Sequence, residues 1–185
     1  YGYRDVAKKQ DSTTATRYVL ASLSKQFTST CVMQLVQEHK IDLDVSLKTY
    51  LPYAPRTWEK ITMRNLLTHT AGFAHDVGPY PVASEQQKDP AAWLHFAYKN
   101  ARLQSSPGER YAYSNAGYEV AGVIVEKVSG ESPFEYGKEH IFDVASIGYS
   151  SMVGGSGQIS DMAVGYQAVN VKNVGLALYQ RHPNA

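Results

Sequence analysis

The order of hydrophobic and polar positions along the chain predicts a helix-rich protein. Apolar residues recur at the spacing of one helix face over residues 22–39, and a second such face is expected over residues 116–129. Shorter helices are indicated over residues 63–70, 90–102 and 133–142. The pattern therefore predicts one helical unit rather than a sheet-dominated fold.

Residues that commonly flank helices support these boundaries. We expect N-caps at Thr62, Asp89, Asn115 and Ser132, and a helix end at Gly130. Strands are expected only near the two ends of the chain, with residues 1–21 extended and a hairpin over residues 163–180. Neither repeats nor a linker divide the sequence, so a single domain over residues 1–185 is expected.

Composition narrows the classes of function without choosing one. The 185 residues carry a formal net charge of +1, which argues against a general electrostatic partnership with nucleic acid. The apolar runs fall far short of the roughly 18 residues that span a bilayer, so no membrane span is expected. Cys31 is the only cysteine, which excludes an internal disulfide.

Ser22 and Lys25 form a Ser-x-x-Lys pair at the start of the first predicted helix. Residues three positions apart share a helix face. A buried amine beside the positive end of a helix loses proton affinity, so Lys25 can act as a general base for the Ser22 hydroxyl. The alternative is that both residues form an ordinary solvated helix end, because such a pair arises by chance in a chain of this size.

Tyr113 and Asn115, in the string YSN, form a second candidate pair. In an extended segment, residues two positions apart point to the same side. A phenol and a carboxamide would then face one space, as a proton shuttle and a hydrogen-bond partner for a substrate. The alternative is that Tyr113 packs in the core and that Asn115 only caps a helix.

Longer sequence segments favour the catalytic interpretation of these two pairs over the structural one. The segments YVLASLSKQFTST, KIDLDVSLKTYLP, ITMRNLLTHTAGF and SPGERYAYSNAGYEVAGVIVEKVSG occur in one order, followed by HIF. Together they resemble the serine β-lactamase-like hydrolase family, which includes class C β-lactamases, DD-carboxypeptidases and related esterases. The resemblance is clearest over residues 2–142, and residues 143–185 match poorly. It implies an α+β fold of the β-lactamase/transpeptidase type, represented mainly by its helical part with remnants of the antiparallel sheet.

The resemblance also implies roles for the four candidate residues. Ser22 would attack a β-lactam, a D-alanyl peptide or an ester and form an acyl-enzyme, while Lys25 and Tyr113 exchange the proton and Asn115 binds the substrate. Neither a metal nor an organic cofactor takes part in that chemistry. Family members usually work outside the cytoplasm, so a periplasmic or secreted location is expected.

The chain also departs from the family pattern. The third motif, Lys-Thr-Gly or His-x-Gly, is missing; the nearest string is KNVG at residues 172–175. We therefore expect an incomplete member of the family, and the alternative function is a binding protein or fragment that keeps the fold without catalysis. Helix faces left uncovered by the missing sheet would favour association with another chain.

His69 is expected to be a structural hydrogen-bonding residue beside the site, and His75 and Asp76 to lie in a solvated loop.

Overall fold

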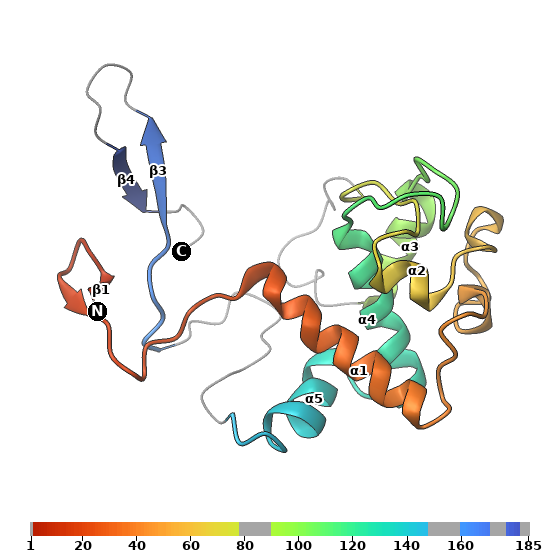
Figure 1. Ribbon diagram of the computed structural model, residues 1–185, viewed down its shortest axis with the longest axis horizontal. Coiled ribbons are helices and arrows are strands. Elements are labelled where there is room, and N and C mark those ends of the chain that lie inside the picture. The colour runs from red at the N-terminus through yellow and green to blue at the C-terminus, as the bar shows by residue number, and fades with distance from the viewer. Residues whose placement is uncertain (1, 78–89, 148–159, 171–176, 182–185) are drawn as a thin grey trace. The chain divides into compact units, whose positions relative to one another are not determined.

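The computed structural model describes residues 2–77, 90–147, 160–170 and 177–181 (Figure 1). The chain divides into two compact units, one made of residues 22–157 and the other of residues 1–21 together with residues 158–185. Each unit is described by itself. The expected single domain over residues 1–185 stays a prediction.

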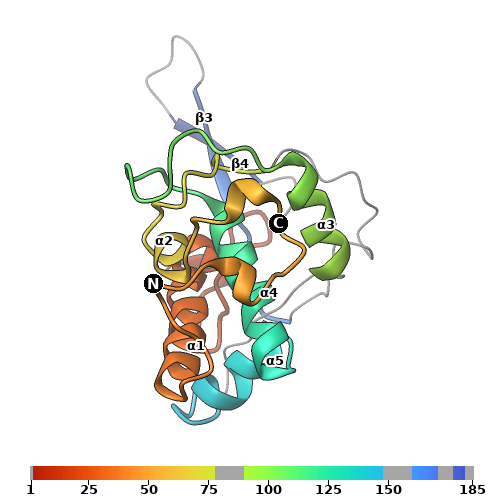
Figure 2. The ribbon, with the colours of Figure 1, turned by 90° about the vertical axis from the view of Figure 1, so that its right-hand side faces the viewer.

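The larger unit is helical and is organised around one central helix. Its α-helices are α1 (Lys25–Gln37), α2 (Met63–Leu67), α3 (Pro90–Asn100), α4 (Asn115–Ser129) and α5 (Pro133–Gly137). Short helical turns add η1 (Ala21–Ser24), η2 (Leu47–Thr49), η3 (Arg56–Trp58) and the π-helical η5 (Lys138–Phe142). Helix α4 packs against α1, α2, α3 and α5, and it lies between α1 and α3 in Figure 2.

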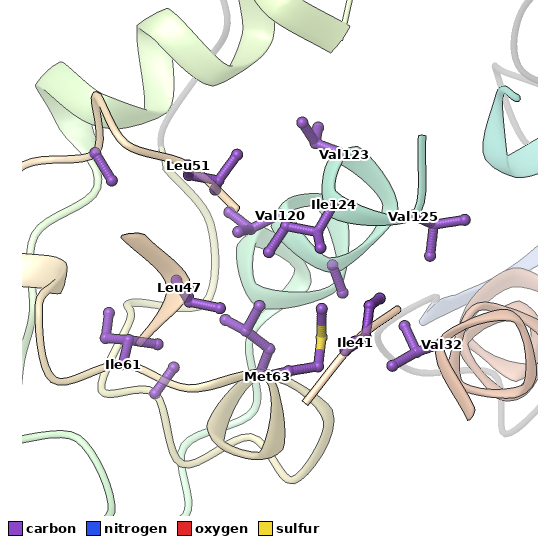
Figure 3. Packing of buried hydrophobic residues seen from close by; sticks show 14 of the residues in the cluster. Val32, Ile41, Leu47, Leu51, Ile61, Met63, Val120, Val123, Ile124 and Val125 are labelled. Carbon is purple, nitrogen blue, oxygen red and sulfur yellow. The ribbon is translucent and has the colours of Figure 1, made fainter. Parts of the chain in front are cut away.

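Buried aliphatic side chains explain why α4 is central. Seven of its fifteen residues are buried, and they include Val120, Ile124 and Val125. They meet Val32 of α1, Met63 of α2, and Leu47 from the segment between these two helices (Figure 3). Burial of large aliphatic side chains stabilises a fold by roughly 1.5–3 kcal/mol each. The core therefore holds both helices that carry the candidate site residues, α1 and α4.

Helix ends follow the sequence predictions at most described positions. The Oγ atoms of Thr62 and Ser132 accept hydrogen bonds from the third residue of α2 and α5, and each belongs to a capping box. Gly130 ends α4 in a left-handed conformation with φ +84°, as predicted. Asp89 lies outside the described residues.

Several predicted boundaries were wrong. The helices expected over residues 63–70 and 90–102 end at Leu67 and Asn100. The helix expected from residue 22 begins as the 3₁₀ turn η1, so α1 proper starts at Lys25. Leu23, one of the apolar positions of the predicted helix face, is 63% exposed. Asn115 does not cap α4. Ser114 does, because its Oγ accepts a hydrogen bond from Gly117 N.

The smaller unit contains the strands. Strand β1 (Tyr3–Asp5) pairs antiparallel with β2 (Gln10–Asp11), and β3 (Tyr166–Asn170) pairs antiparallel with β4 (Ala177–Arg181). This confirms the hairpin expected near the C-terminal end. The buried carboxylate of Asp5 accepts a hydrogen bond from the Tyr166 hydroxyl, which ties the two ends of the chain together.

Candidate active site

Ser22 and Lys25 lie where η1 passes into α1. Lys25 Nζ donates to Ser22 Oγ at the long distance of 3.5 Å, and Ser22 is exposed while Lys25 is half-buried. The residue before the serine, Ala21, has φ +46°, a left-handed conformation that is unfavourable for a residue with a Cβ. The chain therefore makes a strained turn into the helix and leaves the serine hydroxyl open to solvent.

Tyr113 and Asn115 reach the same place from the start of α4. The Tyr113 hydroxyl donates to Ser22 Oγ at 2.7 Å, and Lys25 Nζ donates to Asn115 Oδ1 at 2.8 Å. Ser114 between them points the other way, into the protein, where it caps the helix. Because Ser114 performs the capping, the Asn115 side chain is free to bind the lysine.

Aromatic rings complete the surroundings of the Lys25 ammonium. Its Nζ lies 4.9 Å from the ring centroid of Tyr113 and 5.6 Å from that of Tyr118. A cation over an aromatic face is attracted by the ring quadrupole. Tyr118 is held in turn by a hydrogen bond from its hydroxyl to the Leu67 carbonyl at 2.9 Å. These contacts fix the ammonium between Ser22 and Asn115.

The loop after α2 clamps the YSN segment. Ser114 Oγ donates to the Ala74 carbonyl at 2.8 Å, Asn115 N donates to the His75 carbonyl at 2.8 Å, and Asn115 Nδ2 donates to Asp76 Oδ1 at 3.0 Å. Three consecutive loop residues thus hold two consecutive residues of the YSN segment.

His69 supports Tyr113 from the same loop. Its Nδ1 accepts a hydrogen bond from Ser114 N at 3.1 Å, its carbonyl accepts one from Ala112 N at 2.8 Å, and its ring stacks on Tyr113 with centroids 4.5 Å apart. The expected structural hydrogen-bonding role of His69 is therefore confirmed by its contacts.

The charges of the cluster shift several pKa values. The Lys25 ammonium and the Ser22 hydroxyl lower the pKa of the Tyr113 phenol. Hydrogen bonds from His75 and Asn115 lower the pKa of Asp76. Partial burial and the positive charge of Lys25 lower the pKa of His69, so its neutral form is favoured. The cluster thus combines an ammonium, a carboxylate and a phenol that ionises more readily than usual.

Sequence reasoning named four of the clustered residues and missed others. Ser22, Lys25, Tyr113 and Asn115 are brought together in one hydrogen-bonded cluster. The contacts of Asp76 and Tyr118 were not foreseen. Asp76 stands at no motif spacing from the other four residues, and Tyr118, one helical turn after Asn115, was expected only to pack in the core. His75 and Asp76 are exposed, as expected for a loop, but they form a hydrogen bond with each other and contact the site. Over the described ranges, the one group of three potential metal ligands is Glu131, Glu139 and His140, and none belongs to this cluster.

Comparison with known proteins identifies the family. The Beta-lactamase family model matches residues 1–158. The chain belongs to the Beta-lactamase family. Protein flp of Staphylococcus aureus is 30% identical over 140 residues, which make up 74% of this chain and 28% of that protein.

Solved structures of the family share the fold of this chain. A penicillin-binding protein from Bacillus halodurans superposes with a TM-score of 0.77 at 25% identity, covering 97% of this chain and 54% of that one. A D-amino acid amidase from Ochrobactrum anthropi SV3 gives a TM-score of 0.75 at 25% identity, covering 91% of this chain and 47% of that one. The resemblance and the β-lactamase/transpeptidase-like fold class inferred from the sequence are both confirmed. The chain spans about half the length of these solved relatives.

Proposed function

We propose that this chain carries the nucleophile of a serine acyl-hydrolase that acts through an acyl-enzyme. The observation that carries the proposal is the position of Ser22 Oγ, 2.7 Å from the Tyr113 hydroxyl and 3.5 Å from Lys25 Nζ. Two groups able to exchange a proton thus lie beside one exposed hydroxyl. The β-lactamase and penicillin-binding relatives support this class of reaction.

The distances suggest how the proton moves. Tyr113 in its phenolate form accepts the Ser22 proton as Oγ forms a bond with the substrate carbonyl carbon, and the Lys25 ammonium stabilises the phenolate. Tyr113 then returns the proton to the leaving group as the acyl–leaving-group bond breaks. Water later attacks the Ser22 ester, releases the acid and restores the serine hydroxyl. Proton transfer by such positioned groups contributes about 10²- to 10⁴-fold to a rate.

Asn115 and the start of η1 have supporting roles in this proposal. Asn115 holds the Lys25 ammonium and lies beside the nucleophile, where its carboxamide can contact an acyl side chain. Backbone N–H groups in the first turn of a helix lack intrahelical partners, so the Ser22 N–H can donate to the oxyanion that forms during attack. A second oxyanion donor from a Lys-Thr-Gly or His-x-Gly strand is missing from these 185 residues, and losing one donor typically lowers a rate about a hundredfold or more.

The proposed substrate class is an acyl compound: a β-lactam, a D-alanyl peptide or amide, or an ester. One solved relative is named a penicillin-binding protein and another a D-amino acid amidase complexed with D-phenylalanine, which favours the first two. Members of this family usually work outside the cytoplasm, so we propose an extracytoplasmic location for this protein. No described helix has the length and apolar character needed to cross a membrane.

Intact-mass spectrometry tests the proposal directly. The protein is incubated with a penicillin and, separately, with a fluorophosphonate, beside the Ser22→Ala and Ser24→Ala variants. We expect one stoichiometric adduct on wild type and on Ser24→Ala, and none on Ser22→Ala. An adduct that persists in Ser22→Ala would show that another residue is the nucleophile. A folded wild-type protein without any adduct would favour the non-catalytic alternative.

A further inference from the structure

Asp76 is the charged residue of the cluster that the proposed reaction leaves unused. Its Oδ1 accepts from Asn115 Nδ2 at 3.0 Å, and its Oδ2 lies 2.5 Å from His75 Nδ1. Both carboxylate oxygens are therefore bound, although the side chain is 56% exposed. An exposed carboxylate commonly points into water, whereas the Asp76 carboxylate is turned toward Asn115 and His75.

The Asn115 carboxamide is held between two opposite charges. A carboxylate only accepts hydrogen bonds, and an ammonium only donates them. The amide must therefore direct its Nδ2 at Asp76 and its Oδ1 at Lys25, because the reversed orientation would oppose both charges. Without Asp76, an Asn115 carboxamide in the reversed orientation would meet only one unfavourable contact, that of its Nδ2 with the Lys25 ammonium.

We propose that Asp76 is a positioning residue that fixes the orientation of the Asn115 carboxamide and thereby holds the Lys25 ammonium beside Ser22. It acts through Asn115 and does not itself touch the nucleophile. The inference rests on the proposed function for its catalytic consequence, but the orienting contact can be measured without any turnover.

The pKa of the Tyr113 phenol depends on the charge of Asp76 and can therefore be used to detect it. The groups around that phenol are Ser22 and Lys25 from the start of α1, and His69, His75 and Asp76 from the loop after α2. The Asp76 carboxylate raises the Tyr113 pKa against the larger lowering by Lys25.

The first test is a titration of Tyr113 followed by the ¹³Cζ chemical shift of its ring. Asp76→Asn keeps the shape of the side chain and removes the charge, so the Tyr113 pKa should fall below its wild-type value. The side-chain amide resonances of Asn115 should also shift in Asp76→Asn and in Asp76→Ala. Asp143→Asn is the matched control, since Asp143 is also an exposed aspartate in an ion pair, with Lys138, and should leave both signals unchanged. Unchanged Tyr113 and Asn115 signals in the Asp76 variants would overturn the proposal.

The second test is the rate of adduct formation with the fluorophosphonate. Asp76→Ala should slow it by roughly tenfold, the rate equivalent of one hydrogen bond to a charged group. Asn115→Ala combined with Asp76→Ala should lose much less than the two single losses multiplied together, because Asp76 acts on the nucleophile mainly through Asn115. Wild-type rates in Asp76→Ala, or additive losses in the double variant, would refute the positioning role. A wild-type protein that forms no adduct would refute the proposed function, and the titration would still decide whether Asp76 orients Asn115.

Discussion

The two helix starts that meet at the candidate site are built in opposite ways. At the start of α4, Ser114 is 3% exposed, caps the helix and binds the loop at Ala74. At the start of α1, the N-cap Ser24 makes no side-chain capping bond, Ala21 has a left-handed φ, and residues 21–24 are exposed. The α4 side is fixed by hydrogen bonds, although His69 in its supporting loop also has a positive φ of +56°. The α1 side is exposed and begins with a strained turn.

The two helix starts therefore have different roles in the proposed reaction. The α4 side holds Tyr113 and Asn115 at set positions, so it can preorganise the proton-transfer groups. The α1 side presents Ser22 where a substrate can reach it. Strained backbone persists only where the surrounding structure supports it, and it concentrates at functional sites. Mutations on the α1 side should therefore affect mainly the rate, whereas loss of the cap on the α4 side should lower stability and slow the reaction as well.

Among changes that leave the nucleophile in place, the largest effect is expected from Lys25→Ala on the α1 side. Removing the ammonium takes away the group that stabilises ionised Tyr113, so the rate of adduct formation should fall by about 10³-fold. The melting temperature should change little, because Lys25 is only half-buried. Stopped-flow or timed mass measurements give the rate, and thermal unfolding gives the stability. A rate loss of less than threefold would contradict the role proposed for Lys25.

Ser114→Ala on the α4 side should act mainly on stability. The change removes the cap of α4 and leaves the Ala74 carbonyl without its partner, at a cost of about 2 kcal/mol in the free energy of unfolding. Ser132→Ala is the matched control, because it removes the cap of α5 away from Tyr113 and Asn115. Urea unfolding should show both losses, but only Ser114→Ala should also slow adduct formation. Equal rates in the two variants would mean that the clamp does not position the YSN segment.

His69 should make the α4 side sensitive to acid. Because its pKa is lowered in the folded protein, the unfolded chain binds a proton more readily, and stability is lost as pH falls below the ordinary histidine value of about 6.5. Protonation at Nδ1 would also break the bond from Ser114 N. Unfolding measured from pH 7.5 to 5 should show a smaller decline in His69→Gln than in wild type. The same decline in both would place the acid sensitivity elsewhere.

Some features of the two helix starts could be predicted from the sequence, and others could not. Strings such as LASLSK and YSN carry the four candidate residues, and helical periodicity located α1 and α4 because both bury one face. The capping residue of α4 was misplaced by one position, since Ser114 and Asn115 have similar capping preferences and only the three-dimensional partners of Asn115 distinguish them. Asp76 could not be found from spacing, because it reaches Asn115 across 39 positions through a loop whose path no local pattern specifies.

The smallest effect is expected from Ala21→Gly, and it tests whether the open side is strained at all. Glycine adopts positive φ without the steric penalty that alanine carries, so relief of strain should favour the folded state by up to about 1 kcal/mol. Glycine also makes the unfolded chain more flexible, which opposes the gain by several tenths of a kcal/mol. A net stabilisation in urea unfolding, with slower adduct formation, would show that the strained turn holds Ser22 in place. A net destabilisation with an unchanged rate would show that the left-handed turn at Ala21 contributes nothing to the position of the nucleophile, and the contrast between the two helix starts would then rest on the clamp alone.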